Sequence, residues 1–544
     1  MDLDQITDPG ARRAIHGLLN LVEEVVAENR ALREEVQRLR DEIARLKGEH
    51  GRPALTPNQP APAADHSSER ERRTPATWRK GPKLPRLQIT RVEVLEVDPA
   101  LLPPDAQFKG YEEVVVQDIV LRPDTVLFRT AKWYSPTEGR TYLAPLPAGY
   151  GGEFGPGVRA LVLVLAYFGL MSEPKIVAVL RGVGVLISDG QVSNLLIKGQ
   201  DQFHAEKNAV YAAGLRSSPW QQVDATPTRV DGVNHHCHIV CNPLHTTYQT
   251  TPTKDRQAVL DVLLAGRPRT YLLNAEALAY LNQVQVSART RQRLLHLPRD
   301  TVLDEATMQR WLAEHLAGVS DQQRKWVLDA TAVAAYHAQT EWPVVRLLVA
   351  DDAPQFTWLT EALALCWVHE GRHYKKLDPW LPQHREALTT FLSDFWAYYA
   401  ELLAYRQQPS AAERQRLEAA FDRLFATETG YGALDERLAL TRAKKIPLLR
   451  ALEYPEVPLH NNPAELGARQ RVRKREVSFG PRTSEGVRAW DTFMTLAATA
   501  TKLGVSFYHY IHDRVSGANR MPALAEVIDE RAKDLNLGAS WAAP

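Results

Sequence analysis

The chain has 544 residues, and its hydrophobic fraction of 44% is enough for three or more domains with sizeable cores. The formal net charge is +1, so no overall positive field draws the chain to polyanions, and affinity for nucleic acid has to come from local basic patches. Three cysteines do not suggest a disulfide framework, and no apolar run approaches the ~20 residues that span a bilayer. We therefore expect a soluble, cytoplasmic protein without a membrane partner.

Residues 15–47 carry the heptad pattern of a coiled coil. The a positions are mostly β-branched and the d positions mostly leucine, and glutamates at g face basic residues at e only in a parallel pair. We expect a parallel homodimer or a higher oligomer; the alternative is a single amphipathic helix folded back on its own domain. The predicted dimerisation residues are Val22, Asn29, Leu32, Val36, Leu39 and Ile43.

Residues 48–86 have the composition of a disordered linker with a basic end. Pro, Ala and Ser dominate its first part, and basic residues gather around Trp78 in the second. Arg79 and Lys80 are candidate contacts to a DNA backbone, because basic side chains beside an aromatic ring can follow phosphates and stack on a base. A passive, solvated segment is the alternative.

Residues 87–147 predict a small β-rich module. Runs rich in Val and Ile are broken by Pro and Gly, at 92–94, 111–121 and 125–129. The module contains no cysteine, which excludes a thiolate zinc site there.

Residues 157–218 predict a helical domain. Ser172 and Ser188 can each cap a helix, and glycines at 182 and 184 mark the connection between the two helices. This pattern fits a helix-turn-helix that contacts DNA, and it fits a helical core equally well.

Residues 219–272 predict the first part of an α/β domain. Short runs separated by turn residues indicate an antiparallel meander followed by a helix, at 221–230, 234–242, 245–253 and 255–264. The second part, 343–377, contains a buried apolar run that ends at Asp351, and Ala362–His369 predicts another buried strand.

Two helical insertions, 273–342 and 378–458, interrupt this domain, and 459–515 completes it. The tail, 516–544, gives no clear signal. The sequence therefore predicts a multidomain α/β protein with an N-terminal coiled coil.

A helix N-terminus is predicted at Asn462, a good N-cap, with Pro463 in the first helical position and Glu465 three residues after the cap. Glu465 can simply close a capping box on the backbone. It can also converge with Asp224 and Asp351, which stand at predicted strand ends, on divalent metal.

These segments together resemble transposases of the bacterial insertion-sequence sixty-six family, part of the larger DDE group. The segments that carry the resemblance are Val223-Asp224-Ala225-Thr226-Pro227, the strand before Asp351, Cys366-Trp367-Val368-His369 with Arg372, and Asn461-Asn462-Pro463-Ala464-Glu465 with Arg469. Their order and rough spacing match from about Gly155 to Arg514. The resemblance implies a ribonuclease-H-like catalytic domain.

The resemblance also implies DNA cleavage and strand transfer with two Mg²⁺ ions, for which Mn²⁺ could substitute, held by Asp224, Asp351 and Glu465. Carboxylates suit hard cations, and paired cations can activate the attacking oxygen and stabilise the leaving one. Asp352 competes with Asp351, but successive strand residues point to opposite faces, so only one should reach the metal. His369 is expected beside the scissile phosphate as a catalytic residue.

Double-stranded DNA, as transposon ends and as target, is the implied partner. The candidate DNA contacts near the site are Arg372, Arg469, Arg471, Arg473, Lys474 and Arg475. The chain departs from the family where Leu466 replaces an arginine and Val477-Ser478 replace an aromatic pair. A catalytically idle dimeric DNA-binding protein and a non-transposing metal nuclease on the same fold are the alternatives.

Overall fold

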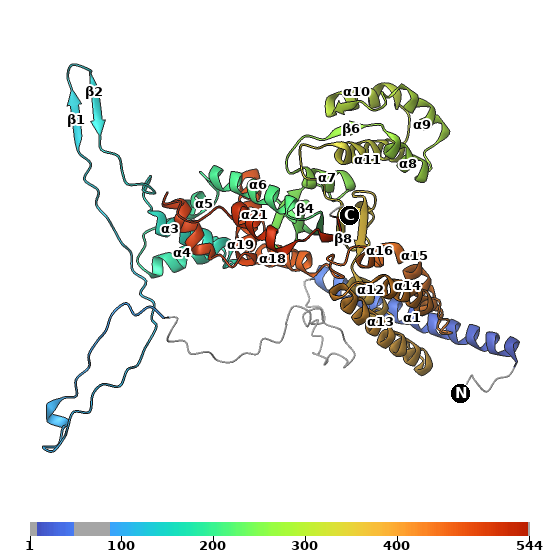
Figure 1. Ribbon diagram of the computed structural model, residues 1–544, viewed down its shortest axis with the longest axis horizontal. Coiled ribbons are helices and arrows are strands. Elements are labelled where there is room, and N and C mark those ends of the chain that lie inside the picture. The colour runs from blue at the N-terminus through green and yellow to red at the C-terminus, as the bar shows by residue number, and fades with distance from the viewer. Residues whose placement is uncertain (1–7, 48–86, 542–544) are drawn as a thin grey trace.

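The computed structural model in Figure 1 describes residues 8–47 and 87–541. The predicted linker, with Arg79 and Lys80, lies outside the described residues. Among the helices that the structure describes, none is long and apolar enough to cross a membrane.

A five-stranded mixed sheet forms the centre of the α/β fold. Its strands are β3 (Trp220–Val230), β4 (Val233–Cys241), β5 (Thr246–Thr251), β8 (Leu347–Ala350) and β9 (Ala362–Leu365), in the order β5-β4-β3-β8-β9. β3, β4 and β5 pair antiparallel, which confirms the predicted meander, and β8 and β9 continue the sheet in parallel. Asp231 and Gly232, with φ of 47° and 78°, form the tight turn between β3 and β4.

The alternation of side chains along β3 sends neighbouring residues to different layers. Val223 and its partner Val240 face the layer that contains α7 (Arg256–Leu264), whereas Ile239, the partner of Asp224, faces α18 (Asn462–Ser478). Asp224 therefore lies on the side of the sheet that α18 covers.

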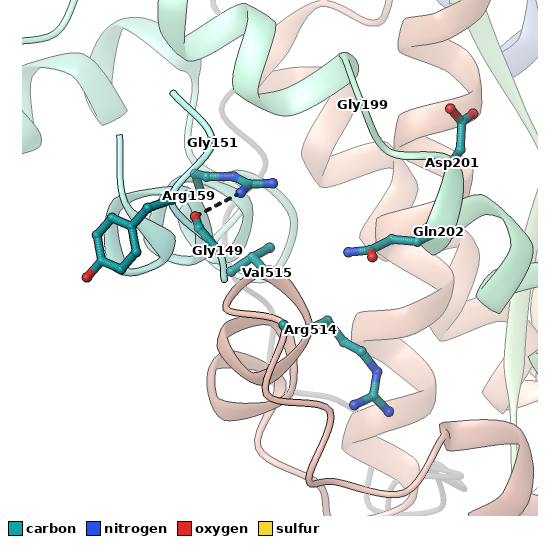
Figure 2. A pocket seen from close by; sticks show the side chains of 10 residues that line it. Gly149, Gly151, Arg159, Gly199, Asp201, Gln202, Arg514 and Val515 are labelled. Atoms are coloured by element: carbon teal, nitrogen blue, oxygen red, sulfur yellow. Dashed lines mark hydrogen bonds between the residues drawn. The ribbon is translucent and has the colours of Figure 1, made fainter. Parts of the chain in front are cut away.

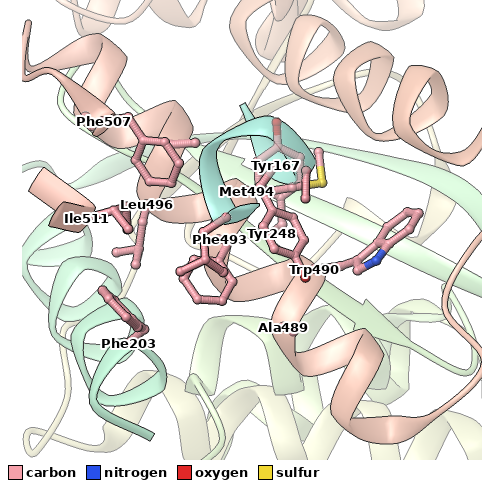
Figure 3. Close-up of a cluster of buried hydrophobic side chains, with 14 of the residues drawn as sticks. Tyr167, Phe203, Tyr248, Ala489, Trp490, Phe493, Met494, Leu496, Phe507 and Ile511 are labelled. Carbon is pink, nitrogen blue, oxygen red and sulfur yellow. The ribbon is translucent and has the colours of Figure 1, made fainter. Parts of the chain in front are cut away.

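The helical segment before the sheet shares a core with the C-terminal helices (Figure 3). The segment consists of α3 (Pro156–Tyr167), α4 (Glu173–Gly182), α5 (Asp189–Ile197) and α6 (Asp201–Arg216). Tyr167 stacks on Phe493 of α19 (Ser484–Lys502) with ring centroids 4.9 Å apart, and Phe203 lies 5.2 Å from the same ring. This segment is therefore packed onto the α/β domain, next to α20 (Phe507–Val515).

The tail contains a helix that the sequence did not predict, α21 (Leu524–Leu535). Leu524 and Ile528 are fully buried, and Asp529 pairs with Arg216 of α6 at 3.2 Å. The tail thus closes the outer face of α6.

Both predicted insertions are helical. The first contains α8 (Ala275–Gln283), α9 (Ala288–Arg293), α10 (Glu305–His315) and α11 (Asp321–Ala338), with a small sheet of β6 (Thr270–Leu272) and β7 (Val302–Asp304). The second contains α13 (Pro382–Gln407), α14 (Ala411–Phe425), α15 (Gly432–Ala443), α16 (Lys445–Leu448) and α17 (Arg450–Glu453). The core of the second insertion surrounds the fully buried Trp367, whose ring lies 5.4 Å from Phe395 and whose indole N–H donates to the Leu448 carbonyl.

The predicted β module is largely wrong. Its described strands are only β1 (Lys132–Ser135) and β2 (Arg140–Leu143), which lie at the tip of an extended arm (Figure 1). Residues 92–94, 111–121 and 125–129 form no strand, and their apolar side chains are exposed, 79% for Val114. High β propensity produces strands only where a neighbouring strand and a packed face are present, and this arm packs on neither.

Helix α1 (Pro9–Leu46) covers the predicted coiled-coil region and packs along the second insertion (Figure 1). The Glu23 carboxylate is buried and accepts hydrogen bonds from the backbone N–H groups of Trp380 and Leu381, and His384 Nδ1 lies 3.2 Å from it. Asn20 accepts from Gly432 N at 2.9 Å.

The packed residues of α1 are b and f positions of the heptads, whereas the a and d seam is exposed, for example 57% for Leu32 and 47% for Leu39. The contact with the insertion therefore leaves the seam free.

Substitutions can test the seam of α1 and its contact with the second insertion separately. Leu32→Asp combined with Leu39→Asp should lower the mass of the free protein in light scattering, because charges in the seam prevent pairing of two copies. Glu23→Ala should leave the mass unchanged and should speed hydrogen exchange at the Trp380 and Leu381 amides by roughly 5- to 150-fold, because it leaves buried donors unpaired at about 1–3 kcal/mol.

Glu24→Ala is the matched control, because Glu24 is exposed on the same turn of α1. Equal exchange in the Glu23 and Glu24 variants would show that the contact with the insertion does not form in solution. An unchanged mass of the double Asp variant would exclude the seam as a dimer interface.

Candidate active site

Asp224 lies in the middle of β3 and is half-buried. Its Oδ1 accepts a hydrogen bond of 2.8 Å from the Ala225 N–H. The pKa of Asp224 is raised from 3.8 to about 7, chiefly by burial and also by the negative charges of Asp351 and Glu465, while the hydrogen bond from Ala225 and the charge of Arg372 oppose the rise. Three carboxylates from distant parts of the sequence therefore act on each other electrostatically.

Asp351 and Asp352 follow β8 directly, and their side chains have different partners. Asp352 forms an ion pair with Lys444, at the junction of α15 and α16, and Lys444 also lies 3.5 Å from the buried Glu370. Asp351 Oδ1 accepts from the Ala353 N–H at 3.3 Å. The charge that acts on Asp224 is that of Asp351, while Asp352 is tied to the second insertion.

Glu465 lies in the first turn and a half of α18, which begins one residue earlier than predicted. The N-cap is Asn461 rather than Asn462, and its carbonyl accepts from the Glu465 N–H at 3.1 Å. The Glu465 carboxylate does not close a capping box; both of its oxygens accept from Arg372, at 3.1 and 2.7 Å. The capping explanation of this glutamate is therefore wrong.

Asn461 joins the elements that carry the carboxylates. Its side-chain NH₂ donates to the Val223 carbonyl at 2.6 Å, beside Asp224, and its backbone N–H donates to Cys366 Sγ at 3.2 Å. Cys366 in turn is the N-cap of α12 (Trp367–Lys375) and accepts from the His369 N–H at 3.4 Å. The paired Asn and Cys-Trp-x-His motifs of the sequence thus meet at one point, which sequence reasoning did not predict.

His369 and Arg372 lie on α12, so the predicted strand Ala362–His369 is wrong beyond Leu365. The apolar run continues past the strand because Trp367 is buried in the core of the second insertion, and not because the sheet is longer. His369 is half-buried in the first turn of α12, and its ring lies 5.1 Å from that of His373.

The basic residues of α18 divide between its buried and exposed sides. Arg469 and Arg473 are exposed, one and two turns after Glu465. Arg475 donates to the Pro227 carbonyl of β3.

Two of the predicted DNA contacts are wrong because the side chains are buried. Arg471 is 0% exposed, pairs with Asp491 at 3.3 Å and donates to Thr250 Oγ1 at 3.0 Å. Lys474 donates to the Met171 carbonyl at 2.9 Å, and burial lowers its pKa to about 8. Arg471 and Lys474 lie on the packed face of α18, whereas the helical period places Arg469 and Arg473 on its exposed face.

A pocket of about 420 Å³ lies elsewhere, between the start of α3, the start of α6 and the end of α20 (Figure 2). Its two arginines are directed at protein groups: Arg159 donates to the Gly149 carbonyl at 3.5 Å, and Arg514 pairs with Asp513 at 2.5 Å. None of the three carboxylates lines this pocket.

The carboxylates fit a hard divalent cation by type, because all of their donors are oxygen atoms, and by charge, because burial and, to a smaller extent, the charges of Asp351 and Glu465 raise the pKa of Asp224. In the described part of the chain, however, no three acidic, His or Cys side chains converge closely enough to hold an ion as they stand. Binding of an ion therefore requires these carboxylates to move closer together than they stand.

The raised pKa of Asp224 makes its charge costly for the fold. Above pH 7 the carboxylate is ionised in both the folded and the unfolded chain, and burying the charge opposes folding. As the pH falls below 7 the folded chain takes up a proton, and the penalty shrinks until it is lost below about pH 4, where the unfolded chain is protonated too. Asp224→Asn should therefore increase the free energy of unfolding at pH 8 by up to roughly 4 kcal/mol, seen as a higher melting temperature. This gain should shrink towards pH 5.

Asp352→Asn is the control, because its carboxylate is exposed and paired with Lys444. It should give no gain at pH 8. A loss of stability at pH 8 in the Asp224 variant would contradict the buried-charge argument.

Comparison with known proteins gives two findings. The model of the transposase IS66 family matches residues 347–489, a range that contains Asp351, His369, Arg372 and Glu465 but not Asp224. A protein of Sinorhizobium fredii (strain NBRC 101917 / NGR234), described as the uncharacterized protein y4jO, is 32% identical over 312 residues, which cover 56% of this chain and 94% of that protein. The chain therefore belongs to the transposase IS66 family.

Proposed function

We propose that the chain is a DDE transposase that binds the terminal inverted repeats of an insertion sequence, cleaves them and joins them to target DNA. The observation that carries this proposal is that Asp224 on β3, Asp351 after β8 and Glu465 on α18 lie close enough for the charges of Asp351 and Glu465 to act on Asp224. The strand order and directions support a ribonuclease-H-like catalytic domain.

Asp224, Asp351 and Glu465 would hold two Mg²⁺ ions, which supply an activated oxygen nucleophile and stabilise the leaving oxygen when bound. Asn461 fixes the distance between β3 and α18, so the carboxylates of these two elements keep one relative position. His369, half-buried on α12, can donate a hydrogen bond to a phosphate oxygen from the side of the centre that Arg372 occupies.

The exposed side of α18 supports a DNA path away from the centre. Arg469 and Arg473 follow Glu465 at intervals of four residues, about 6 Å each along the helix. Phe479 is the C-cap of the helix, and it is 88% exposed in left-handed backbone with φ of 59°. An exposed aromatic ring after a row of arginines can stack on a base while the arginines bind phosphates.

The free seam of α1 supports a parallel homodimer. Glutamate and arginine positions that flank the seam pair across a parallel dimer, and the b and f positions that contact the second insertion lie away from it. Each copy can therefore pair through α1 while α1 stays packed on its own insertion.

Substitution of the three carboxylates tests the proposed chemistry. Asp224→Asn, Asp351→Asn and Glu465→Gln should each lower Mg²⁺-dependent cleavage of DNA from the borders of the element by orders of magnitude, because each removes a negative ligand. Binding of the same DNA by the Asp224 and Asp351 variants, measured without a divalent cation, should stay close to the parent, and Asp352→Asn should cleave nearly as well as the parent. Full cleavage by the Glu465 variant would exclude the proposal.

Arg469→Gln combined with Arg473→Gln tests the DNA path. Loss of two phosphate contacts should reduce the slope of log affinity against log salt concentration by about two, measured by fluorescence anisotropy with a short duplex. The matched control is Arg531→Gln combined with Lys533→Gln, since both side chains are exposed on α21, which packs on α6. If the two double variants show the same salt dependence of affinity, the DNA does not bind along the exposed face of α18.

A further inference from the structure

The guanidinium of Arg372 and the carboxylate of Glu465 form a two-bond ion pair. Arg372 Nη1 and Nη2 donate to Glu465 Oε1 and Oε2 at 3.1 and 2.7 Å, so each carboxylate oxygen has a cationic donor. This parallel arrangement matches the planar geometry of both groups. While the pair is formed, both oxygens of Glu465 are engaged by Arg372.

The pair joins two helices that meet at the centre and do not otherwise depend on it. Arg372 lies on α12 and Glu465 on α18, and the two helices are held together independently by the bond from Asn461 to Cys366. Opening the pair therefore leaves the backbone of the site in place.

The exposure of the pair makes it easy to open. The side chain of Arg372 is 46% exposed and that of Glu465 is 23% exposed, and exposed ion pairs contribute little to stability because water and salt compete for both charges. The nearby pair of Glu370 with Arg437 has side chains 2% and 14% exposed, and opening it would strand a buried charge. The Arg372–Glu465 pair is therefore suited to an exchange of partners, whereas the Glu370–Arg437 pair is suited to hold α12 permanently against the second insertion.

We propose that Arg372 is a displaceable counter-cation of the catalytic centre. In the metal-free protein it neutralises Glu465; when a divalent cation binds the carboxylates, Glu465 turns to Asp224 and the released guanidinium binds a DNA phosphate. This inference rests on the proposed function, and it adds that metal and DNA binding favour each other through one side chain. Linkage requires that the coupling be reciprocal.

The first experiment measures Mn²⁺ binding without DNA, by electron paramagnetic resonance of the free ion. Arg372→Gln removes the competitor and should tighten Mn²⁺ binding up to roughly fivefold, the range expected for an exposed ion pair. Arg372→Lys keeps the positive charge but cannot form the two-bond pair, and it should tighten binding in the same direction. A simple loss of local positive charge would instead affect only the Gln variant.

The second experiment measures binding of a short DNA duplex by anisotropy, with and without Ca²⁺ as a divalent cation of the same ligand preference. The parent should bind DNA more tightly with Ca²⁺, and Arg372→Gln should lose most of this gain. Arg437→Gln is the matched control, since it removes the arginine of the Glu370–Arg437 pair, and the gain should persist in it wherever its melting curve shows a folded protein.

The outcomes separate the inference from the proposed function. Unchanged Mn²⁺ affinity in both Arg372 variants, with a parent that binds Mn²⁺, would overturn the counter-cation and leave the metal centre intact. A parent that binds no Mn²⁺ would overturn both. Tighter Mn²⁺ binding together with lost coupling supports the exchange of partners.

Discussion

The geometry of the centre depends on the hydrogen bonds of Asn461. The carboxylates come from a central strand, from the end of a neighbouring strand and from a helix that follows the second insertion, so no local structure sets their distances. Asn461 bonds the Val223 carbonyl, the Cys366 thiol and the Glu465 N–H at once, which gives β3, α12 and α18 a common reference point. A buried amide is suited to this, because one side chain and its backbone can serve several partners. Helical insertions of any length can then separate these elements in the sequence without altering the site.

The charged residues of α18 and its surroundings fall into two classes: buried ion pairs that stabilise the fold, and carboxylates whose charge the protein does not compensate. Arg471 and Asp491 are buried together and bond Thr250, so their charges are compensated within the protein and hold α18 and α19 against β5. Asp224 is different, because burial together with the charges of Asp351 and Glu465 raises its pKa to about 7. A buried carboxylate that the protein does not fully compensate either takes up a proton or pairs with an external cation, and such perturbed groups are typical of functional sites.

The sequence predicted the elements with strong periodicity and failed where burial depends on distant contacts. The meander β3 to β5 and both helical insertions were predicted correctly, because turn residues and apolar spacing are local signals. The strand predicted up to His369 ends at Leu365, since an apolar residue buried by an insertion looks the same in sequence as one buried by a sheet. Arg471 and Lys474 were assigned to DNA by composition, although only the packed face of α18 shows which basic residues reach solvent. The Val-rich arm after residue 87 failed for a related reason, because β propensity without a partner strand does not specify a sheet.

The second insertion connects α1 to the candidate active site through packed side chains. Glu23 of α1 bonds the backbone at the start of α13, and Phe395 of that helix packs on Trp367, the first residue of α12. Arg372 lies on the same helix α12, slightly more than one turn further on. If two copies pair through the free seam of α1, the opposite face of each α1 helix still packs on the second insertion, which in turn packs on α12 with Arg372. The distance between the two candidate sites of such a dimer would then depend on buried contacts within each copy. Packed contacts of this kind hold two parts of a protein in place more rigidly than a flexible linker does.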